Sequence, residues 1–278
     1  MLNKITIVLL ALLLQACAIS VGERNIIMQD EQVVTLSPAD INTIKQLKSG
    51  LEVTHLKLKR SDGATADGVW IEQAGSKAVI IYFSGNAMRI KEDYNSLLPE
   101  LLKLKTDVVW LDHRGTGGSD GEPSVDTLFQ DGLETYDYVT SRTDKKIIPH
   151  GMSLGSFVAG SIATEKSVDG LILEGSATNT DDWLDSSLPW YLKVFANVSI
   201  EGQLKTAGNS KVVQQYSGPI FIIIGENDKV TPVNLSEKLY QQSISTDKHI
   251  LVVKGRRHGD VLRDDGAKAA LRGFIERL

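Results

Sequence analysis

The chain has 278 residues, of which 42% are hydrophobic and 23% are charged. This composition is typical of a globular protein and excludes wholesale disorder, collagen and a multi-span membrane protein. The 30 Lys and Arg residues against 35 Asp and Glu leave a formal charge of −5. A mildly acidic chain without a basic tract gives no electrostatic reason to expect a nucleic-acid partner. The single cysteine, Cys17, excludes an intrachain disulfide and a zinc site built from cysteines.

The N-terminus has the pattern of a secretory signal. Lys4 precedes an apolar run over residues 5–14, which is half of the roughly 20 residues that a membrane-spanning helix needs. The run Leu-Gln-Ala before Cys17 resembles the bacterial lipobox, in which cleavage makes the cysteine the first residue and its sulfur receives a lipid. The resemblance implies a signal peptide over residues 1–16 and an acyl (palmitate-type) anchor on Cys17. A signal without lipid attachment, or a buried core cysteine, is the alternative.

Ala18, rather than Asp, follows Cys17, and resemblance to lipoprotein sorting rules then implies the outer membrane of a bacterial envelope, facing the periplasm. We interpret residues 17–53 as a tether and N-terminal segment, with a helix over Pro38–Leu47. A lipid anchor of this kind would hold the protein on a membrane surface.

From residue 54 to residue 278 the chain alternates between short apolar runs and segments with helical spacing. Residues 54–60 and 68–73 flank a turn and predict a hairpin. The following runs are continuously apolar, as expected for strands buried on both faces of a parallel sheet: they are residues 78–83, 107–111, 146–150, 170–174, 219–225 and 249–253. Helices are predicted over residues 91–104, 125–140, 156–165, 234–242 and 267–278. The pattern predicts one doubly wound α/β domain.

One interval, residues 176–218, far exceeds the usual connection of roughly 2–6 residues. It contains Trp183, Trp190 and Tyr191. We expect either a cap insertion over a pocket or ordinary crossover helices that pack on the sheet.

The candidate nucleophile is Ser153. It lies in a G-x-S-x-G run, Gly151–Gly155, between a predicted strand and a predicted helix. This context is that of a nucleophile elbow, whose turn is too tight for side chains at the glycine positions.

A serine nucleophile needs a base, and the base needs an orienting acid. Of five histidines, His258 is the candidate base because it lies in a loop between the last strand and the last helix. Asp228 is the candidate acid because it follows the carboxyl end of a buried strand, and Glu174 and Glu226 are its rivals. The remaining histidines suit structural roles better: His55, His113, His150 and His249.

Together with the elbow, three further runs resemble α/β-hydrolases of the BEM46-like and serine-aminopeptidase-like group. They are residues 82–87 for the H-G-N-A loop, residues 111–123 for the D-Y-R-G-x-G-x-S-x-G-x-P run, and residues 225–232 for the G-x-x-D-x-x-x-P acid loop. The resemblance implies a mostly parallel eight-stranded sheet. It also implies an oxyanion hole made by the backbone N–H groups of Asn86 and Leu154, with Ala87 as the alternative to Asn86.

The chain departs from this pattern at Ser84, where the family usually has histidine. We expect altered hydrogen bonding in that loop without loss of activity. Asp112 and Arg114 are expected to hold the glycine-rich loop in place. Arg256 and Arg257 beside His258 would disfavour an imidazolium, so we expect them to point into solvent or to meet an anionic substrate.

These features predict a serine hydrolase, anchored at a bacterial membrane, that cleaves an ester or thioester of a small-molecule or lipid acyl substrate without a metal or other cofactor. An acyltransferase or peptidase with the same triad, a non-catalytic envelope lipoprotein and a metal-dependent hydrolase are the alternatives. The acyl group and the oligomeric state are not predicted.

Overall fold

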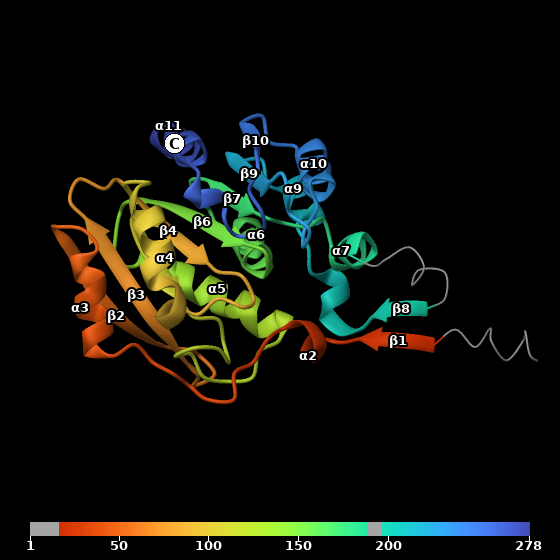
Figure 1. The fold of residues 1–278 in the computed structure, drawn as a ribbon, viewed down its shortest axis with the longest axis horizontal. Coiled ribbons are helices and arrows are strands. Elements are labelled where there is room, and N and C mark those ends of the chain that lie inside the picture. Colours follow the sequence, from red (N-terminus) through yellow and green to blue (C-terminus); the bar gives the residue numbers. More distant parts are fainter. Residues whose placement is uncertain (1–16, 188–195) are drawn as a thin grey trace, which may run out of the picture.

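The computed structural model describes residues 17–187 and 196–278, so the predicted signal peptide lies outside the described residues. In this part of the chain, no helix has the length and apolarity to cross a bilayer. An eight-stranded sheet in the order β10-β9-β7-β6-β4-β5-β3-β2 forms the centre, and helices cover both of its faces (Figure 1). The strands are β2 (Leu51–Lys59), β3 (Thr65–Gln73), β4 (Ala78–Phe83), β5 (Asp107–Leu111), β6 (Lys146–Met152), β7 (Leu171–Glu174), β9 (Ile220–Gly225) and β10 (Lys248–Val253). Only the pairs β2–β3 and β3–β5 of this sheet are antiparallel, which confirms the mostly parallel sheet and the hairpin.

Adjacent residues of the central strands belong to two separate cores. In β4, Ile81 packs in the core under α5, α6 and α9, whereas its neighbour Ile80 packs in the core under α3, α4 and α11. Both side chains are almost fully buried, as continuous apolar strands require. The helices are α2 (Glu23–Ile26), α3 (Pro38–Gln46), α4 (Ile90–Leu102), α5 (Val125–Thr140), α6 (Leu154–Glu165), α7 (Thr180–Ser187), α9 (Ser210–Gln215), α10 (Val233–Gln242) and α11 (Asp265–Arg277), with 3-10 turns η1 (Gly202–Thr206) and η2 (Val261–Arg263).

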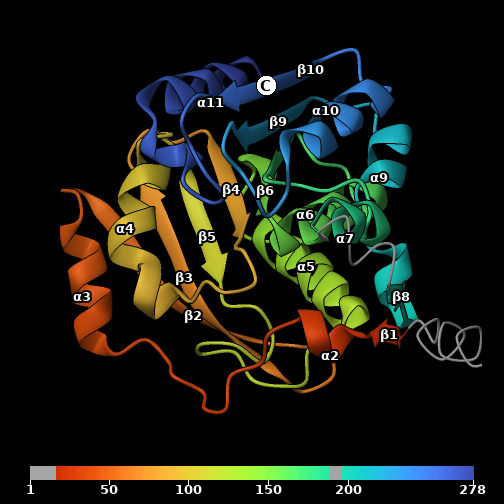
Figure 2. The same cartoon turned by 45° about the vertical axis from the view of Figure 1, so that its right-hand side comes forward.

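The N-terminal segment packs on this domain. Its first strand, β1 (Cys17–Val21), pairs in parallel with β8 (Ala196–Ile200) from the insertion, and the two extend away from the large sheet (Figure 1). After α2 the chain runs along the edge of the sheet to α3 (Figure 2). Ile27 lies in one core and Leu36 in the other. The residues interpreted from the sequence as a tether thus contribute buried side chains to the fold.

Candidate active site

Ser153 stands at the sharp turn between β6 and α6. Its backbone adopts φ 54° and ψ −119°, a conformation that L-residues rarely hold and that concentrates at functional sites. A Cβ atom at Gly151 would lie 2.2 Å from the carbonyl oxygen of Gly155, and one at Gly155 would lie 2.1 Å from that of Phe83. The two glycines therefore let α6 pack closely against β6, which leads into Ser153, and against the end of β4. Strand β6 runs two residues beyond the predicted end, up to the residue before Ser153.

His258 and Asp228 are in direct contact. Nδ1 of His258 lies 2.7 Å from Oδ2 of Asp228. The other oxygen, Oδ1, accepts the backbone N–H groups of Val230 and Thr231, each at 2.8 Å, and the Thr231 hydroxyl donates to Oδ2 at 3.0 Å. Because the carboxylate accepts the Nδ1 proton, the neutral imidazole carries its free lone pair on Nε2, as a general base requires.

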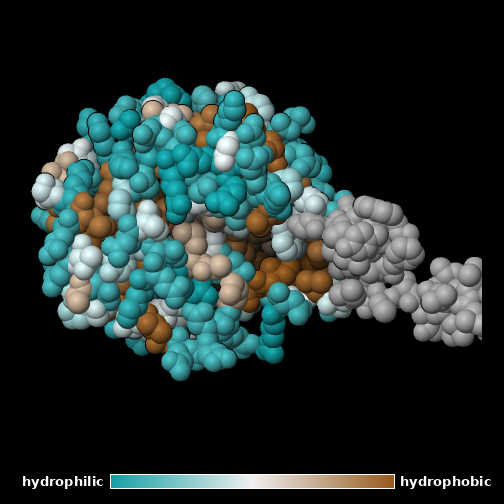
Figure 3. Space-filling view, in the orientation of Figure 1, coloured by the Kyte–Doolittle hydropathy of each residue, from teal (hydrophilic) through white to brown (hydrophobic). Residues whose placement is uncertain are grey.

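Ser153 and His258 line one cavity of about 440 Å³. Ser153 therefore lies at the same cavity as His258. Its hydroxyl, however, makes no hydrogen bond to His258 or to any other described residue. Resting enzymes often have such loose contacts, which tighten with substrate. Figure 3 shows a brown, apolar recess in the region of α6, η1 and α2. Apolar side chains supply most of the wall: Ile26, Met88, Met152, Leu154, Phe157, Ala177, Trp183, Leu204 and Val230.

The rival acids are engaged elsewhere. The carboxylate of Glu174 lies 3.0 Å from Nε2 of His150, and both side chains are buried. Glu226 accepts the backbone N–H of Gly255 and does not line the cavity. Asp228 is the carboxylate that meets His258.

Residues 84–88, which we call the oxyanion loop, form a turn in which the Met88 N–H donates to the carbonyl of Gly85 at 3.1 Å. Asn86 and Leu154 both line the cavity. Their backbone N–H groups, and that of Ala87, donate to no acceptor among residues 17–187 and 196–278. Two such donors beside a nucleophile are what an oxyanion hole requires.

At Ser84, where the related motif has histidine, the loop is held by a contact from His113. The Ser84 hydroxyl is buried without a hydrogen-bond partner among the described residues, while its backbone carbonyl lies 2.8 Å from Nε2 of His113. Desolvation by burial lowers the pKa of His113, which keeps the ring neutral with Nε2–H as the donor. His113 thus has a structural role, as expected, through a contact that no sequence pattern indicates.

The glycine-rich loop is fixed by Asp112 and Arg114, in line with their expected roles. Asp112 accepts the backbone N–H groups of Ile90 at 2.8 Å and Gly118 at 3.0 Å. Arg114 donates two hydrogen bonds to Asp131, at 3.0 and 2.6 Å. Neither Asp112 nor Arg114 lines the cavity.

The two arginines beside His258 point away from the cavity. Arg256 donates to the carbonyl of Arg263 at 3.2 Å, and the side chain of Arg257 is 80% exposed. Neither lines the cavity; Arg257 faces solvent as expected, whereas Arg256 is partly buried against residues 263 and 264.

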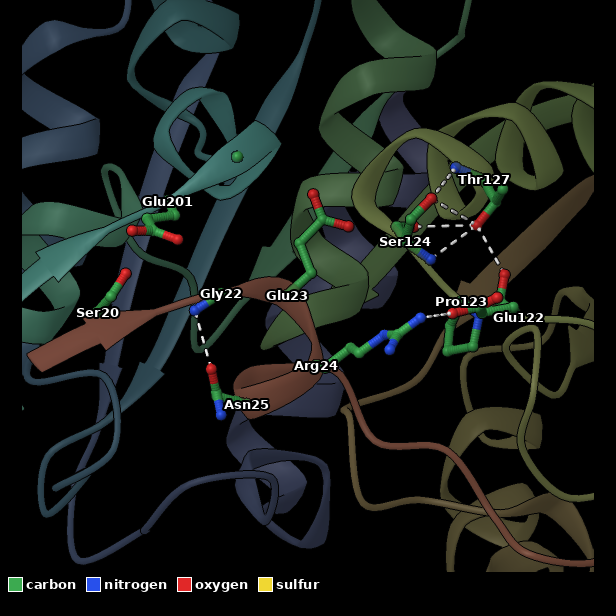
Figure 4. Close-up of a pocket in the computed structure, with 11 residues that line it drawn as sticks. Ser20, Gly22, Glu23, Arg24, Asn25, Glu122, Pro123, Ser124, Thr127 and Glu201 are labelled. Atoms are coloured by element: carbon green, nitrogen blue, oxygen red, sulfur yellow. Dashed lines mark hydrogen bonds and ion pairs between the residues drawn. The ribbon is translucent and has the colours of Figure 1, made fainter.

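A second, more open hollow of about 810 Å³ lies between α2 and the start of α5. Figure 4 shows Arg24 reaching across it to Glu122, at 2.5 Å. In the same view, Ser124 and Thr127 bond to each other and cap α5. The hollow contains none of the candidate catalytic residues, and the smaller apolar cavity is therefore the candidate site.

Solved structures share this fold. An esterase of Pyrococcus furiosus, Pf2001, superimposes with a TM-score of 0.69 at 18% identity, over 90% of this chain and 99% of that chain. A hydrolase of Pseudomonas aeruginosa superimposes with a TM-score of 0.60 at 18% identity, over 82% of this chain and 99% of the other. At these identities the likeness shows the α/β-hydrolase fold.

Among curated proteins, the chain is 32% identical over 191 residues to the lysophosphatidylserine lipase ABHD12 of Macaca fascicularis, which covers 63% of this chain and 48% of the relative. It is 30% identical over 245 residues to the protein ABHD12B of Homo sapiens, with 78% and 66% covered. The chain thus spans about half the length of the first of these relatives.

The model of the family described as serine aminopeptidase, S33, matches residues 74–217. This range includes the oxyanion loop and the elbow and ends before Asp228. The match extends over more than half of the chain, which therefore belongs to the S33 serine aminopeptidase family of hydrolases.

Proposed function

We propose that this protein is a serine hydrolase that cleaves a carboxylic ester or thioester with Ser153 as nucleophile, His258 as base and Asp228 as orienting acid. The observation that carries the proposal is the 2.7 Å contact between His258 and Asp228 at an apolar cavity that Ser153 also lines. Family membership and the lipase name of the relatives support hydrolysis of an ester.

In the proposed mechanism, the Ser153 Oγ attacks the carbonyl carbon and Nε2 of His258 takes the hydroxyl proton. Asp228 stabilises the resulting imidazolium without taking up the proton itself. The proton then passes to the leaving oxygen or sulfur, and an acyl-enzyme remains. Water releases the acyl group by the same route, with His258 again as the base.

The backbone N–H groups of Asn86 and Leu154 would face the oxygen that becomes negative in each tetrahedral intermediate. They have no other acceptor among the described residues, so they need not break a bond to take this role. The loss of one donor of this kind typically costs about 2.7–4 kcal/mol in barrier height.

The apolar wall of the cavity suits the acyl chain of a substrate. Its wall includes Phe157, Trp183 and Leu204, and two of these three side chains come from the 176–218 insertion, which supports the cap interpretation. The relatives named lysophosphatidylserine lipase point to the same class, because a lysophospholipid carries one acyl chain. We therefore propose a monoacyl ester, such as a lysophospholipid, as the substrate class.

We also propose that the protein is held at a bacterial membrane by a lipid on Cys17, on the periplasmic face of the outer membrane. The supporting feature is the lipobox-like sequence before Cys17. Cys17 begins β1, and only a few residues separate that strand from Asn25 and Ile26 in the cavity wall. The anchor would thus hold the active site close to the membrane surface in which a monoacyl lipid substrate resides.

Labelling with a fluorophosphonate probe tests the mechanism, because the probe needs an activated serine and little substrate recognition. We expect Ser153 to be labelled in the wild type, and labelling to disappear in Ser153→Ala and His258→Ala. Ser161→Ala, on the same helix α6, and His249→Ala are matched controls that should label normally. A folded wild-type protein that the probe does not label would overturn the proposal.

For a protein that labels, hydrolysis of esters and thioesters with one acyl chain tests the substrate class. Addition of an alcohol acceptor, followed by product analysis, separates hydrolysis from acyl transfer. Release of free fatty acid supports the hydrolase, whereas transfer of the acyl group to the alcohol as the main reaction contradicts it.

A further inference from the structure

The N-terminal segment forms part of the active-site wall. Asn25 and Ile26, at the end of α2, line the same cavity as Ser153. Beyond them the chain is tied to the glycine-rich loop, since the Asp30 N–H donates to the carbonyl of Gly115 at 2.8 Å. The carboxylate of Asp30 also accepts the Gly117 N–H at 2.7 Å. These contacts hold residues 25–30 against the domain at the edge of the cavity.

The side chain of Asn86 clamps this segment to the oxyanion loop. Its Oδ1 accepts the Met28 N–H at 2.9 Å, and its Nδ2 donates to the carbonyl of Ile26 at 2.5 Å. The two backbone groups are two residues apart in the sequence. The amide bonds to them in the same pattern as a backbone residue of a neighbouring parallel strand. Only an amide side chain offers a donor and an acceptor side by side, so aspartate could make only one of the two bonds.

Arg89 makes a second link between the loop and the segment. It donates two bonds to Asp30, each at 2.6 Å, in the paired geometry that makes such contacts strong and directional. Its Nη1 donates to the carbonyls of Asn86 and Met88, both at 2.9 Å. Arg89 is only 6% exposed. Its buried guanidinium therefore connects the oxyanion loop to the N-terminal segment.

These bonds set the direction of the candidate oxyanion donors. In a trans peptide, the C=O and the following N–H point in opposite directions. The bond from Met88 to the Gly85 carbonyl fixes the peptide whose N–H belongs to Asn86. The bond from Arg89 to the Asn86 carbonyl fixes the peptide whose N–H belongs to Ala87. Of the two amides of this loop that could face the oxyanion, that of Ala87 is thus oriented by Arg89, which Asp30 of the N-terminal segment holds, and that of Asn86 by a bond within the loop.

We propose that residues 25–30 are a positioning element of the active site, which acts through the side chains of Asn86 and Arg89 to orient the oxyanion loop. This inference rests on the proposed function. It means that the catalytic unit includes chain that precedes the predicted hydrolase domain, residues 54–278. Removal of the clamp should weaken stabilisation of the transition state more than binding of the substrate.

The experiment compares Asn86→Ala with the wild type in the full chain, using p-nitrophenyl butyrate and a trifluoromethyl ketone that forms a tetrahedral adduct on the serine. We expect kcat to fall about 10- to 100-fold, as for misplaced catalytic groups, with KM changed less than about threefold. The inhibition constant of the ketone should rise by the factor that kcat/KM falls, because both report binding of the oxyanion. Asn86→Asp, which keeps one of the two bonds, should fall between the wild type and Asn86→Ala.

Arg24→Ala is the matched control. It removes the Arg24–Glu122 contact of the same segment without touching the oxyanion loop, and we expect unchanged kcat and ketone binding. If Asn86→Ala fails to fold, Asp30→Asn tests the same link through Arg89 by the same two readouts. Unchanged kcat and ketone binding in a folded Asn86→Ala or Asp30→Asn would overturn the inference. Failure of the proposed function is distinguishable, because then the wild type itself would not react with the fluorophosphonate.

Discussion

Nε2 of His113 lies 2.8 Å from the carbonyl oxygen of Ser84 and holds the start of the oxyanion loop. The motif that this loop resembles has histidine at the position of Ser84 itself. Here the imidazole is that of His113, in the loop after β5. It contacts the backbone of Ser84, the residue that stands where the motif has histidine. With the bonds to the carbonyls of Gly85 and Asn86, three successive peptides of the loop have their orientation fixed.

We expect His113→Ala to lower kcat by about tenfold. The oxyanion loop would lose one of the three hydrogen bonds to its carbonyls, and its N–H groups would then be positioned less accurately. His113→Gln, which can still donate to the Ser84 carbonyl, should recover part of the loss. Steady-state kinetics and thermal melting of both variants provide the measurement. If His113→Ala retained full kcat, the loop would not depend on this contact.

The strained backbone of Ser153 predicts a stability gain on substitution. At φ 54° and ψ −119°, a residue with a Cβ costs about 1–3 kcal/mol, and glycine adopts such angles with little strain. We expect Ser153→Gly to have a free energy of unfolding about 1 kcal/mol above that of Ser153→Ala, although both are inactive. Urea unfolding of the two variants checks this, and equal stabilities would mean that the turn is not strained.

Asp228 should be far more important for turnover than its neighbour in the sequence, Glu226. An amide at position 228 cannot stabilise the imidazolium and favours the wrong tautomer, so we expect Asp228→Asn to reduce kcat by about 10³- to 10⁴-fold. Glu226→Gln should stay within about threefold of the wild type, since among the described residues the Glu226 carboxylate accepts a hydrogen bond from the backbone of Gly255 alone. The measurement is kcat of the two variants. Similar losses of kcat in both would contradict the assignment of Asp228 as the acid of the triad.

Burial raises the pKa of Asp112 from 3.8 to about 6. The folded state therefore binds the proton more tightly than the unfolded state, and the stability contributed by the protonated form is lost as the pH rises from about 4 to about 6. We expect this contribution to be on the order of 2–3 kcal/mol. Unfolding by urea at several pH values should show it in the wild type and not in Asp112→Asn.

Asp126→Asn is the control for the pH experiment, because Asp126 is an exposed residue in the first turn of α5. Its stability profile should follow that of the wild type. A profile of Asp112→Asn that also follows the wild type would show that Asp112 does not carry the pH dependence.

Cys17→Ser tests the anchor. A serine at this position cannot form a thioether with a lipid, so we expect the variant to lose incorporation of labelled palmitate and to leave the membrane fraction. Fractionation and metabolic labelling in a bacterial host provide the measurement. Hydrolysis of a soluble ester should persist, since Ser153, His258 and Asp228 are unchanged in this variant. A variant that still incorporates palmitate would contradict lipidation at Cys17.

The parts of the fold that the sequence predicts well carry local signals. The helix over Val125–Thr140 has the predicted bounds, because apolar periodicity and the Ser124 cap both mark it. The hydroxyl of Ser124 accepts the Thr127 N–H at 3.1 Å, as a capping residue should. The elbow around Ser153 is likewise a local pattern of glycines between a strand and a helix.

Elements that depend on distant partners were not predictable in this way. Strand β1 has five residues and finds its partner, β8, in the insertion, and no periodic pattern in either segment identifies the other. The role of the Asn86 side chain depends on the backbone of Ile26 and Met28, whose position is decided by the whole fold. Sequence spacing likewise left Glu174 as a rival acid, until its contact with His150 was visible.

The parallel pairing of β1 with β8 also affects the order of folding. Residues 22–195, which include six of the eight strands of the central sheet, lie between the two strands in the sequence, so the entropy of closing that loop favours their pairing only after much of the central sheet has formed. Until then the backbone around residue 17 stays unpaired, and a peptide bond in this state is accessible to a protease. Under the proposed lipidation at Cys17, a signal peptidase would therefore meet an open cleavage site, and the processed end would dock as one of the last steps of folding.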